Sequence, residues 1–198
     1  MFSFRKLLLP LLSAAGLTLA TLSASASPVV FNFDSDTTGI PNPSDTVGGL
    51  TLSVFGAGTV CDVSEVGFAS ISGNALITDF CGGTSGGTII GFSSYLSSLT
   101  FDYVISGIDP VGFLYLLDGN FVGTGSLAFT PGAPPSFEGS QTITGTFDAV
   151  LFDTGNSESD YALDNLSATV ATPEPSSITL LSTGILGCIG LVRRRLKS

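Results

Sequence analysis

The sequence predicts an all-β protein, a β-sandwich or jelly roll, between two apolar terminal segments. Three observations lead to this prediction. Short apolar or alternating runs recur along the central chain, and Gly, Pro, Asp and Ser separate them. β-branched and aromatic residues are frequent in these runs, and few segments repeat apolar residues at the spacing of a helix. Many short strands at such spacing are typical of sandwiches and barrels.

Ten runs are predicted to be strands. They are, in chain order, Val29–Phe33, Leu50–Phe55, Gly67–Ser72, Ala75–Thr78, Thr88–Phe92, Leu99–Ile105, Gly112–Leu117, Ser126–Thr130, Gln141–Phe147 and Tyr161–Val170. In Leu99–Ile105 the apolar residues at 99, 101, 103 and 105 alternate with Thr100, Asp102 and Ser106, which predicts a strand with one buried face. Gly112–Leu117 is apolar on both faces and is therefore predicted to be a central strand. Pro131–Pro135 is predicted to be a loop.

The first 26 residues have the three parts of a secretory signal peptide. Arg5 and Lys6 form a short basic region, Leu7–Leu22 is mostly apolar, and Ala24–Ala26 fits a cleavage site. Cleavage after Ala26 would leave residues 27–172 as the body of the protein. An uncleaved membrane anchor is the weaker alternative, because a proline and a glycine interrupt the apolar run.

The chain ends in residues 173–198, which begin with a proline-rich motif followed by an apolar segment. Pro173, Glu174 and Pro175 are predicted to be extended and exposed, because proline lacks a backbone donor and fixes φ. Ser176–Val192 carries no charge. As a helix it would reach roughly 26 Å, a little less than the ~30 Å hydrocarbon core of a membrane. It is therefore predicted to be a single transmembrane helix.

A basic cluster completes the C-terminal pattern. Arg193, Arg194 and Arg195 follow the apolar segment, with Lys197 after them. The positive-inside rule keeps these cations cytoplasmic and places the body on the far side of the inner membrane. The order Pro-Glu-Pro, apolar span, arginine cluster resembles the PEP-CTERM sorting signal of Gram-negative bacteria. An ordinary single-pass anchor with a proline-rich stalk is the alternative.

The PEP-CTERM resemblance implies a processing partner and a destination. In that family a membrane protease called exosortase is thought to cut near the Pro-Glu-Pro motif and to release the body or transfer it to the cell surface. Such proteins often occur in producers of exopolysaccharide. The resemblance therefore implies a chain that is exported, held transiently in the membrane and then placed at the cell surface or outside the cell.

The body has no cationic side chain. All six Lys and Arg residues lie in the two terminal segments, the chain has no His, and fifteen of the sixteen acidic residues lie in the body. The body therefore carries a net charge near −15, whereas the whole chain carries −10. Nothing in it neutralises phosphates, which excludes nucleic-acid binding. A serine triad, a Schiff base and an imidazole zinc site are excluded as well.

Cys61 and Cys81 are the only cysteines of the body. Export delivers them to an oxidising compartment, where disulfides form and persist. Closing a loop of ~20 residues would stabilise the fold by roughly 3 kcal/mol in the chain-entropy model. We therefore predict a disulfide between them, and two buried free cysteines are the alternative.

A second, less specific resemblance predicts a calcium site. Phe31–Asp34 and Tyr161–Leu166 are similar to the opening and closing strands of jelly-roll carbohydrate-binding modules. In some of those modules one acidic residue from each strand and nearby backbone carbonyls hold a structural calcium ion. The resemblance therefore implies Asp34 and Asp164 as ligands, with Asn165 in a structural role. Alternatively, Asp164 satisfies a turn at the start of a strand.

Asp34 and Asp36 also begin a pattern that is close to a calcium-binding loop. Asp34-x-Asp36-x-Thr38-Gly39 is followed by Asp45 at the twelfth position. The pattern departs from that loop because Thr38 replaces Asp or Asn, Asp45 replaces Glu, and two prolines stiffen the segment. Asp36 joins the candidate ligands on this pattern, and an acidic glycine-rich turn without a metal is the alternative.

Together these features predict an exported surface or matrix protein that is non-catalytic, associates with exopolysaccharide or biofilm, and is stabilised by calcium. A carboxylate-dependent glycoside hydrolase or lyase is one alternative, although no spacing marks out a pair of acids. A purely structural surface protein without a glycan ligand is another. The aromatic residues considered for a sugar-stacking platform, which strands more often bury in a core, are Phe31, Tyr95, Tyr103, Tyr115 and Tyr161.

Overall fold

The computed structural model describes residues 26–64, 68–78, 86–107, 110–127, 136–153 and 159–172, together with Gly184. Strands dominate these residues, with one short 3-10 helix, η2 (Phe33–Ser35). The all-β prediction is therefore confirmed. In chain order the strands are β1 (Val29–Phe31), β2 (Ser44–Val47), β3 (Leu50–Gly56), β4 (Thr59–Asp62), β5 (Asn74–Ile77), β6 (Thr88–Ser106), β7 (Gly112–Leu117), β8 (Asn120–Ser126), β9 (Ser136–Asp153) and β10 (Asp160–Val170).

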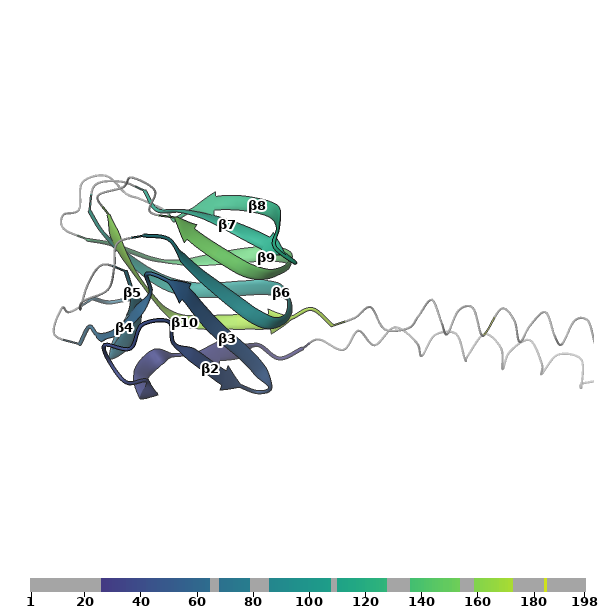
Figure 1. Cartoon of the computed structure of the whole chain (residues 1–198), viewed down its shortest axis with the longest axis horizontal. Coiled ribbons are helices and arrows are strands. Elements are labelled where there is room, and N and C mark those ends of the chain that lie inside the picture. Colours follow the sequence, from purple (N-terminus) through teal and green to yellow (C-terminus); the bar gives the residue numbers. More distant parts are fainter. Residues whose placement is uncertain are drawn as a thin grey trace, which may run out of the picture. The chain divides into compact units, whose positions relative to one another are not determined.

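Two long strands, β6 and β9, join two layers of strands (Figure 1). Residues 88–92 of β6 pair with β3, whereas residues 96–106 pair with β10. β9 pairs with β6 in both parts, and its last residues also pair with β7. One layer therefore runs β2-β3-β6-β9-β7-β8, and the other runs β4-β5-β10-β6-β9 with β1 on β10. This arrangement is consistent with the predicted sandwich.

Aromatic rings form the centre of the core. Phe152 of β9 lies with its ring centroid 5.4 Å from Phe101, 5.8 Å from Phe113 and 5.6 Å from Tyr161. These partners come from β6, β7 and β10, and all four side chains are buried. Tilted and edge-on ring pairs of this kind contribute beyond the area that they bury. The cluster therefore ties the strands of both layers together.

The strand predictions were largely correct, with identifiable errors. The predicted buried face of Leu99–Ile105 is confirmed, since its four alternate apolar side chains are at most 2% exposed, but Val104 on the opposite face is buried as well, in a second apolar cluster. β7 is confirmed as a central strand between β8 and β9. The strand predicted at Gly67–Ser72 is wrong, because residues 68–72 form no strand. Two predicted strands, over 88–92 and 99–105, prove to be one continuous strand, and β2, β4 and most of β8 were missed.

The predicted terminal segments lie outside the described residues, apart from Ala26 and Gly184. They comprise the signal peptide 1–26 and the sorting signal 173–198, with its span at 176–192. Within the part of the chain that the structure describes, no helix has the length and apolar character needed to cross a membrane. The signal peptide, the span and the sorting signal stay predictions.

Candidate functional site

Asp34 and Asp164, the two predicted calcium ligands, lie close enough for their charges to interact. β1 pairs antiparallel with β10, and Phe31 lies opposite Leu166. The chain then turns through η2, which carries Asp34, while Asp164 lies within β10. Pairing of the first strand with the last therefore brings together two acids that are far apart in the sequence.

Asp164 is a buried acid without a cation near it in the body. Its side chain is 2% exposed. Burial raises its pKa to about 6, and the charges of Asp34 and Asp102 add to that rise. Hydrogen bonds from the backbone N–H groups of Asn165 and Ser72 oppose it. At neutral pH the site therefore holds a buried negative charge that only amide dipoles compensate.

The segment before β5 fits closely against these carboxylates. The backbone N–H of Ser72 donates to Asp164, and that of Asn74 donates to Asp34 Oδ1 at 3.1 Å. Gly73 between them has φ +72°, and a Cβ there would collide with Asp34 Oδ1. Glycine is thus required for both its backbone conformation and its lack of a side chain. Sequence reasoning missed these contacts, for which a Ser-Gly-Asn turn was the only signal.

Asn165, to which the resemblance assigns a structural role, lies at an irregular point of β10. It has φ +51° and lies where the register between β10 and β6 shifts. Its side-chain amide donates to Asp102 Oδ2 at 3.1 Å, and Asp102 lies directly opposite Asp164 on β6. The irregular pairing at Asn165 therefore holds the acids of the two strands next to each other.

The carboxylates of Asp34 and Asp164 fit a calcium ion by their chemistry, since hard cations prefer oxygen ligands. A cation there would also compensate the buried charge of Asp164. Across the described ranges, however, no three or more acidic or cysteine side chains are arranged to hold a metal. Asp36, the third predicted ligand, reaches this region through its backbone carbonyl, which accepts from the side chain of Asn74 at 2.9 Å. Calcium binding stays a prediction.

The carboxylate of Asp36 belongs to a different environment. Burial raises its pKa, and the neighbouring charge of Asp45 adds to the rise. A shallow pocket of about 260 Å³ adjoins it. The lining residues are Ser35, Asp36, Thr37, Ile40, Pro43 and Ser44. Asp36 and Asp45, two of the three acids of the loop pattern, thus come together, but Asp45 belongs to strand β2.

Asp34 and Asp164 do not suit acid–base chemistry on a polysaccharide, although a raised pKa is what a catalytic acid needs. A glycosidase requires both carboxylates to reach the bond that is cut. Asp164 is buried under the segment before β5, and its Oδ1 accepts the Asn165 backbone N–H at 2.7 Å. A bulky substrate cannot contact it without opening of that segment.

Only one of the two cysteines of the predicted disulfide lies within the described residues. Cys61 lies in β4 and is 1% exposed. Cys81 lies outside the described residues. The pairing of the two cysteines therefore stays a prediction.

The aromatic residues considered for a sugar platform are mostly core residues. Phe31, Tyr103 and Tyr161 are at most 2% exposed, which rules them out as a surface platform. Tyr115 is half-buried against the core. Only Tyr95, at 48%, is well exposed.

A different set of residues forms an uncharged surface on the layer that contains β8. Two rows of directly opposed residues cross five strands here, and their neighbours Val54, Ile90 and Val150 point into the core. We call these rows the outer face. One row is Phe55, Ile89, Leu151, Leu114 and Thr124, and the other is Ser53, Gly91, Ala149, Leu116 and Phe121. None of the ten residues carries a charge.

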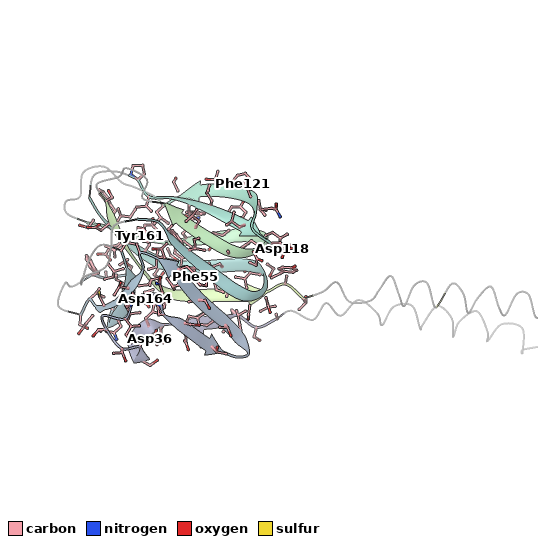
Figure 2. The ribbon with its side chains drawn as sticks, in the orientation of Figure 1. Asp36, Phe55, Asp118, Phe121, Tyr161 and Asp164 are labelled. Carbon is pink, nitrogen blue, oxygen red and sulfur yellow. The ribbon has the colours of Figure 1, made fainter. Side chains whose placement is uncertain are left out.

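Exposed apolar side chains lie at both sides of the outer face. Phe55 of β3 is 56% exposed and Phe121 of β8 is 63% exposed, and Figure 2 labels both. Ile89 between them is 36% exposed. Gly91 and Ala149 have small side chains or none, so the surface in the middle of the second row is lower than at Phe121. The result is an apolar tract with an exposed ring at either side.

Polar groups border this tract near β8. Asp118 lies in the turn between β7 and β8, and its carboxylate accepts the hydroxyl of Tyr95 at 3.1 Å. Its own backbone N–H donates to the carboxylate of Asp148 at 3.1 and 3.2 Å. The hydrogen bond to Asp118 raises the pKa of Tyr95, and the negative charge of that carboxylate adds to the rise.

Comparison with known proteins supports the fold and leaves the function open. No protein-family model matches the chain, and no curated protein matches it. Among solved structures, the K2 cleaved adhesin domain of Lys-gingipain is similar, with 12% identity, a TM-score of 0.51, and coverage of 73% of this chain and 98% of that one. At that identity the likeness concerns the fold alone.

Two carbohydrate-binding modules resemble the chain more distantly. A variant of the family 29 module CBM29-2 has 16% identity and a TM-score of 0.38, covering 67% of this chain and 89% of its own. The xylan-binding CBM22-1 domain from Paenibacillus barcinonensis has 12% identity and a TM-score of 0.32, covering 76% and 100%. Scores this low do not establish a shared fold.

Proposed function

We propose that the protein is an exported, non-catalytic surface or matrix protein that associates with extracellular polysaccharide through the outer face. One observation carries this proposal: an exposed apolar tract without charge, on a body with fifteen acids and no cation. Exposed tracts of this kind mark interaction sites, and ligand sites are commonly apolar with few polar groups. Fold alone assigns no function, so the tract and not the adhesin likeness supports the proposal.

The test is binding to the exopolysaccharide of the organism that makes the protein. We expect saturable binding of the purified protein, with no shortening of the polysaccharide during long incubation. Shortened products that disappear in Asp or Glu substitutions would favour a glycoside hydrolase or lyase instead. Absence of both binding and cleavage would leave a purely structural surface protein.

Export and processing form the second part of the proposal. The signal peptide 1–26 and the Pro173-Glu174-Pro175 signal support export through the inner membrane, with an exosortase-like protease as partner. We expect the intact mass of the surface-recovered protein to lack residues 1–26 and Arg193–Ser198. A chain recovered with its arginine cluster attached would contradict processing by such a protease.

The same mass measurement reports the proposed disulfide between Cys61 and Cys81. Formation of the bond removes two hydrogen atoms, and reduction followed by alkylation should then label both cysteines. Labelling of Cys61 or Cys81 without prior reduction, in unfolded protein, would support free thiols. The bond is proposed because export places both residues in an oxidising compartment.

Calcium is the remaining part of the proposal. Asp34 and Asp164 would hold the ion together with backbone carbonyls, and it would supply the positive charge that the body lacks. The raised pKa of Asp164 supports this, because the buried carboxylate has no cationic partner. In this role the ion stabilises the joint between the first and last strands and takes no part in a reaction.

A further inference from the structure

We propose that the ligand of the outer face is an uncharged polysaccharide that lies across the strands from Phe55 to Phe121 and binds without calcium. This inference rests on the proposed function and names the class of ligand. It follows from the charge of the body, from the spacing of the two rings, and from the separation of the outer face from the buried acids.

The charge of the body selects against anionic chains. A body near −15 repels a polyanion within about one Debye length, ~10 Å at 0.1 M salt, and has no Lys, Arg or His to offset that repulsion. Asp148 directly precedes Ala149 of the outer face, and Asp118 lies in the turn between Leu116 and Phe121, so an anionic chain there would approach carboxylates. An uncharged chain avoids this cost and can donate its hydroxyl groups to the Asp118 carboxylate.

The spacing of the rings indicates an extended ligand. Phe55 and Phe121 lie on the two outer strands of a five-strand span, β3-β6-β9-β7-β8. Four steps of ~4.8 Å between neighbouring strands separate them by roughly 19 Å. A single sugar cannot touch both rings, whereas an oligosaccharide can. Its less polar ring faces would stack on the two side chains, with the low surface at Gly91 and Ala149 beneath the middle of the chain.

The outer face is separate from the proposed calcium ligands. Its strands form one layer, whereas Asp164 lies on β10 of the other layer and Asp34 on η2, which follows β1. None of its ten residues can ligate a cation through a carboxylate. Binding of an uncharged chain therefore has no need of a divalent bridge, and calcium affects stability only.

The experiment compares a neutral and an anionic probe on the protein recovered from the cell surface, from which the basic residues Arg193–Lys197 are expected to be removed. Xyloglucan and alginate serve as probes in affinity electrophoresis, at low and high salt, with calcium and with EDTA. We expect retardation by xyloglucan under all four conditions and none by alginate. We expect Phe55→Ala and Phe121→Ala each to weaken xyloglucan binding at least about tenfold, which corresponds to ~1.4 kcal/mol. Ile40→Ala, at a side chain 47% exposed outside the outer face, is the matched control and should change nothing.

The outcomes separate the two proposals. Retardation by alginate alone, or only with calcium, would overturn the uncharged ligand and leave a polysaccharide-binding protein. Xyloglucan binding that survives both phenylalanine substitutions would overturn the assignment to the outer face. No retardation by either probe, together with no binding to the native exopolysaccharide, would overturn both the inference and the proposed function.

Discussion

Asp164→Asn is expected to stabilise the protein in EDTA at pH 7 and to abolish its response to calcium. The folded pKa of Asp164 is about 6, against 3.8 for an ordinary Asp. Ionising the buried acid therefore costs up to about 3 kcal/mol of folding free energy. The amide is close in shape and carries no charge, so it removes this cost. It also removes one of the two charges that a calcium ion would compensate.

The pH dependence has a definite sign. Because folding raises the pKa of Asp164, the stabilising contribution of the protonated acid is complete below pH ~4 and is lost as the pH rises through about 6. Burial shifts Asp36 in the same direction. Urea unfolding of the wild type in EDTA should therefore show falling stability between pH 4 and 7, and Asp164→Asn should show a flatter profile.

The control for this experiment is Asp118→Asn, at an exposed acid away from β10. It should leave both the pH profile and the calcium response unchanged. A wild-type profile that is flat between pH 4 and 7 would contradict the buried, uncompensated charge. A full calcium-dependent rise in Tm in both Asp164→Asn and Asp164→Ala would exclude the site shared by Asp34 and Asp164.

Phe152→Ala is expected to cost 3–5 kcal/mol, a large part of the 5–15 kcal/mol that a typical domain has. Its ring contacts Phe101, Phe113 and Tyr161, which come from three strands, and it is fully buried. The cavity would lie where the two layers meet. Equilibrium unfolding in urea should show a lower midpoint, or no cooperative transition if the variant fails to fold.

Phe55→Ala is the matched control for Phe152→Ala. It removes the same side chain from β3 of the same layer, but from a position that is 56% exposed. We expect a change within about 1 kcal/mol, in the range of ordinary surface substitutions. Equal losses in the two variants would contradict the assignment of Phe152 to the core and of Phe55 to the surface.

The local pattern of apolar and polar residues predicted many of the strands. The predictions failed where contacts between strands, and not the local sequence, determine the structure. The alternation in Leu99–Ile105 predicted the face that packs in the main core, but it did not predict that Val104 on the opposite face is buried in a second cluster. β8 was largely missed because its glycines lower the propensity for a strand. In the structure Gly123 and Gly125 lie directly against the rings of Tyr115 and Phe113, which leave no space for a Cβ. No local signal reports that contact.

The candidate site was predictable to a similar extent. The pairing of the opening and closing strands brought Asp34 and Asp164 together. The amides that bind them come from Ser72, at the end of a predicted strand, and from Asn74, between two predicted strands. The outer face was missed although a signal existed. Leu50, Leu52 and Val54 alternate as buried residues, so Phe55 had to point outward, where an aromatic side chain is unexpected.

The two long strands have a consequence for how the molecule comes apart. β6 and β9, of 19 and 18 residues, each supply hydrogen bonds to both layers. Because β6 and β9 belong to both layers, unfolding of these two strands would disrupt both layers together. Amide protons on opposite sides of the sandwich should then exchange through one shared opening, and partial release of a single layer is not available to the chain. Binding at the outer face would therefore protect the pairing of β10 with β6 in the other layer.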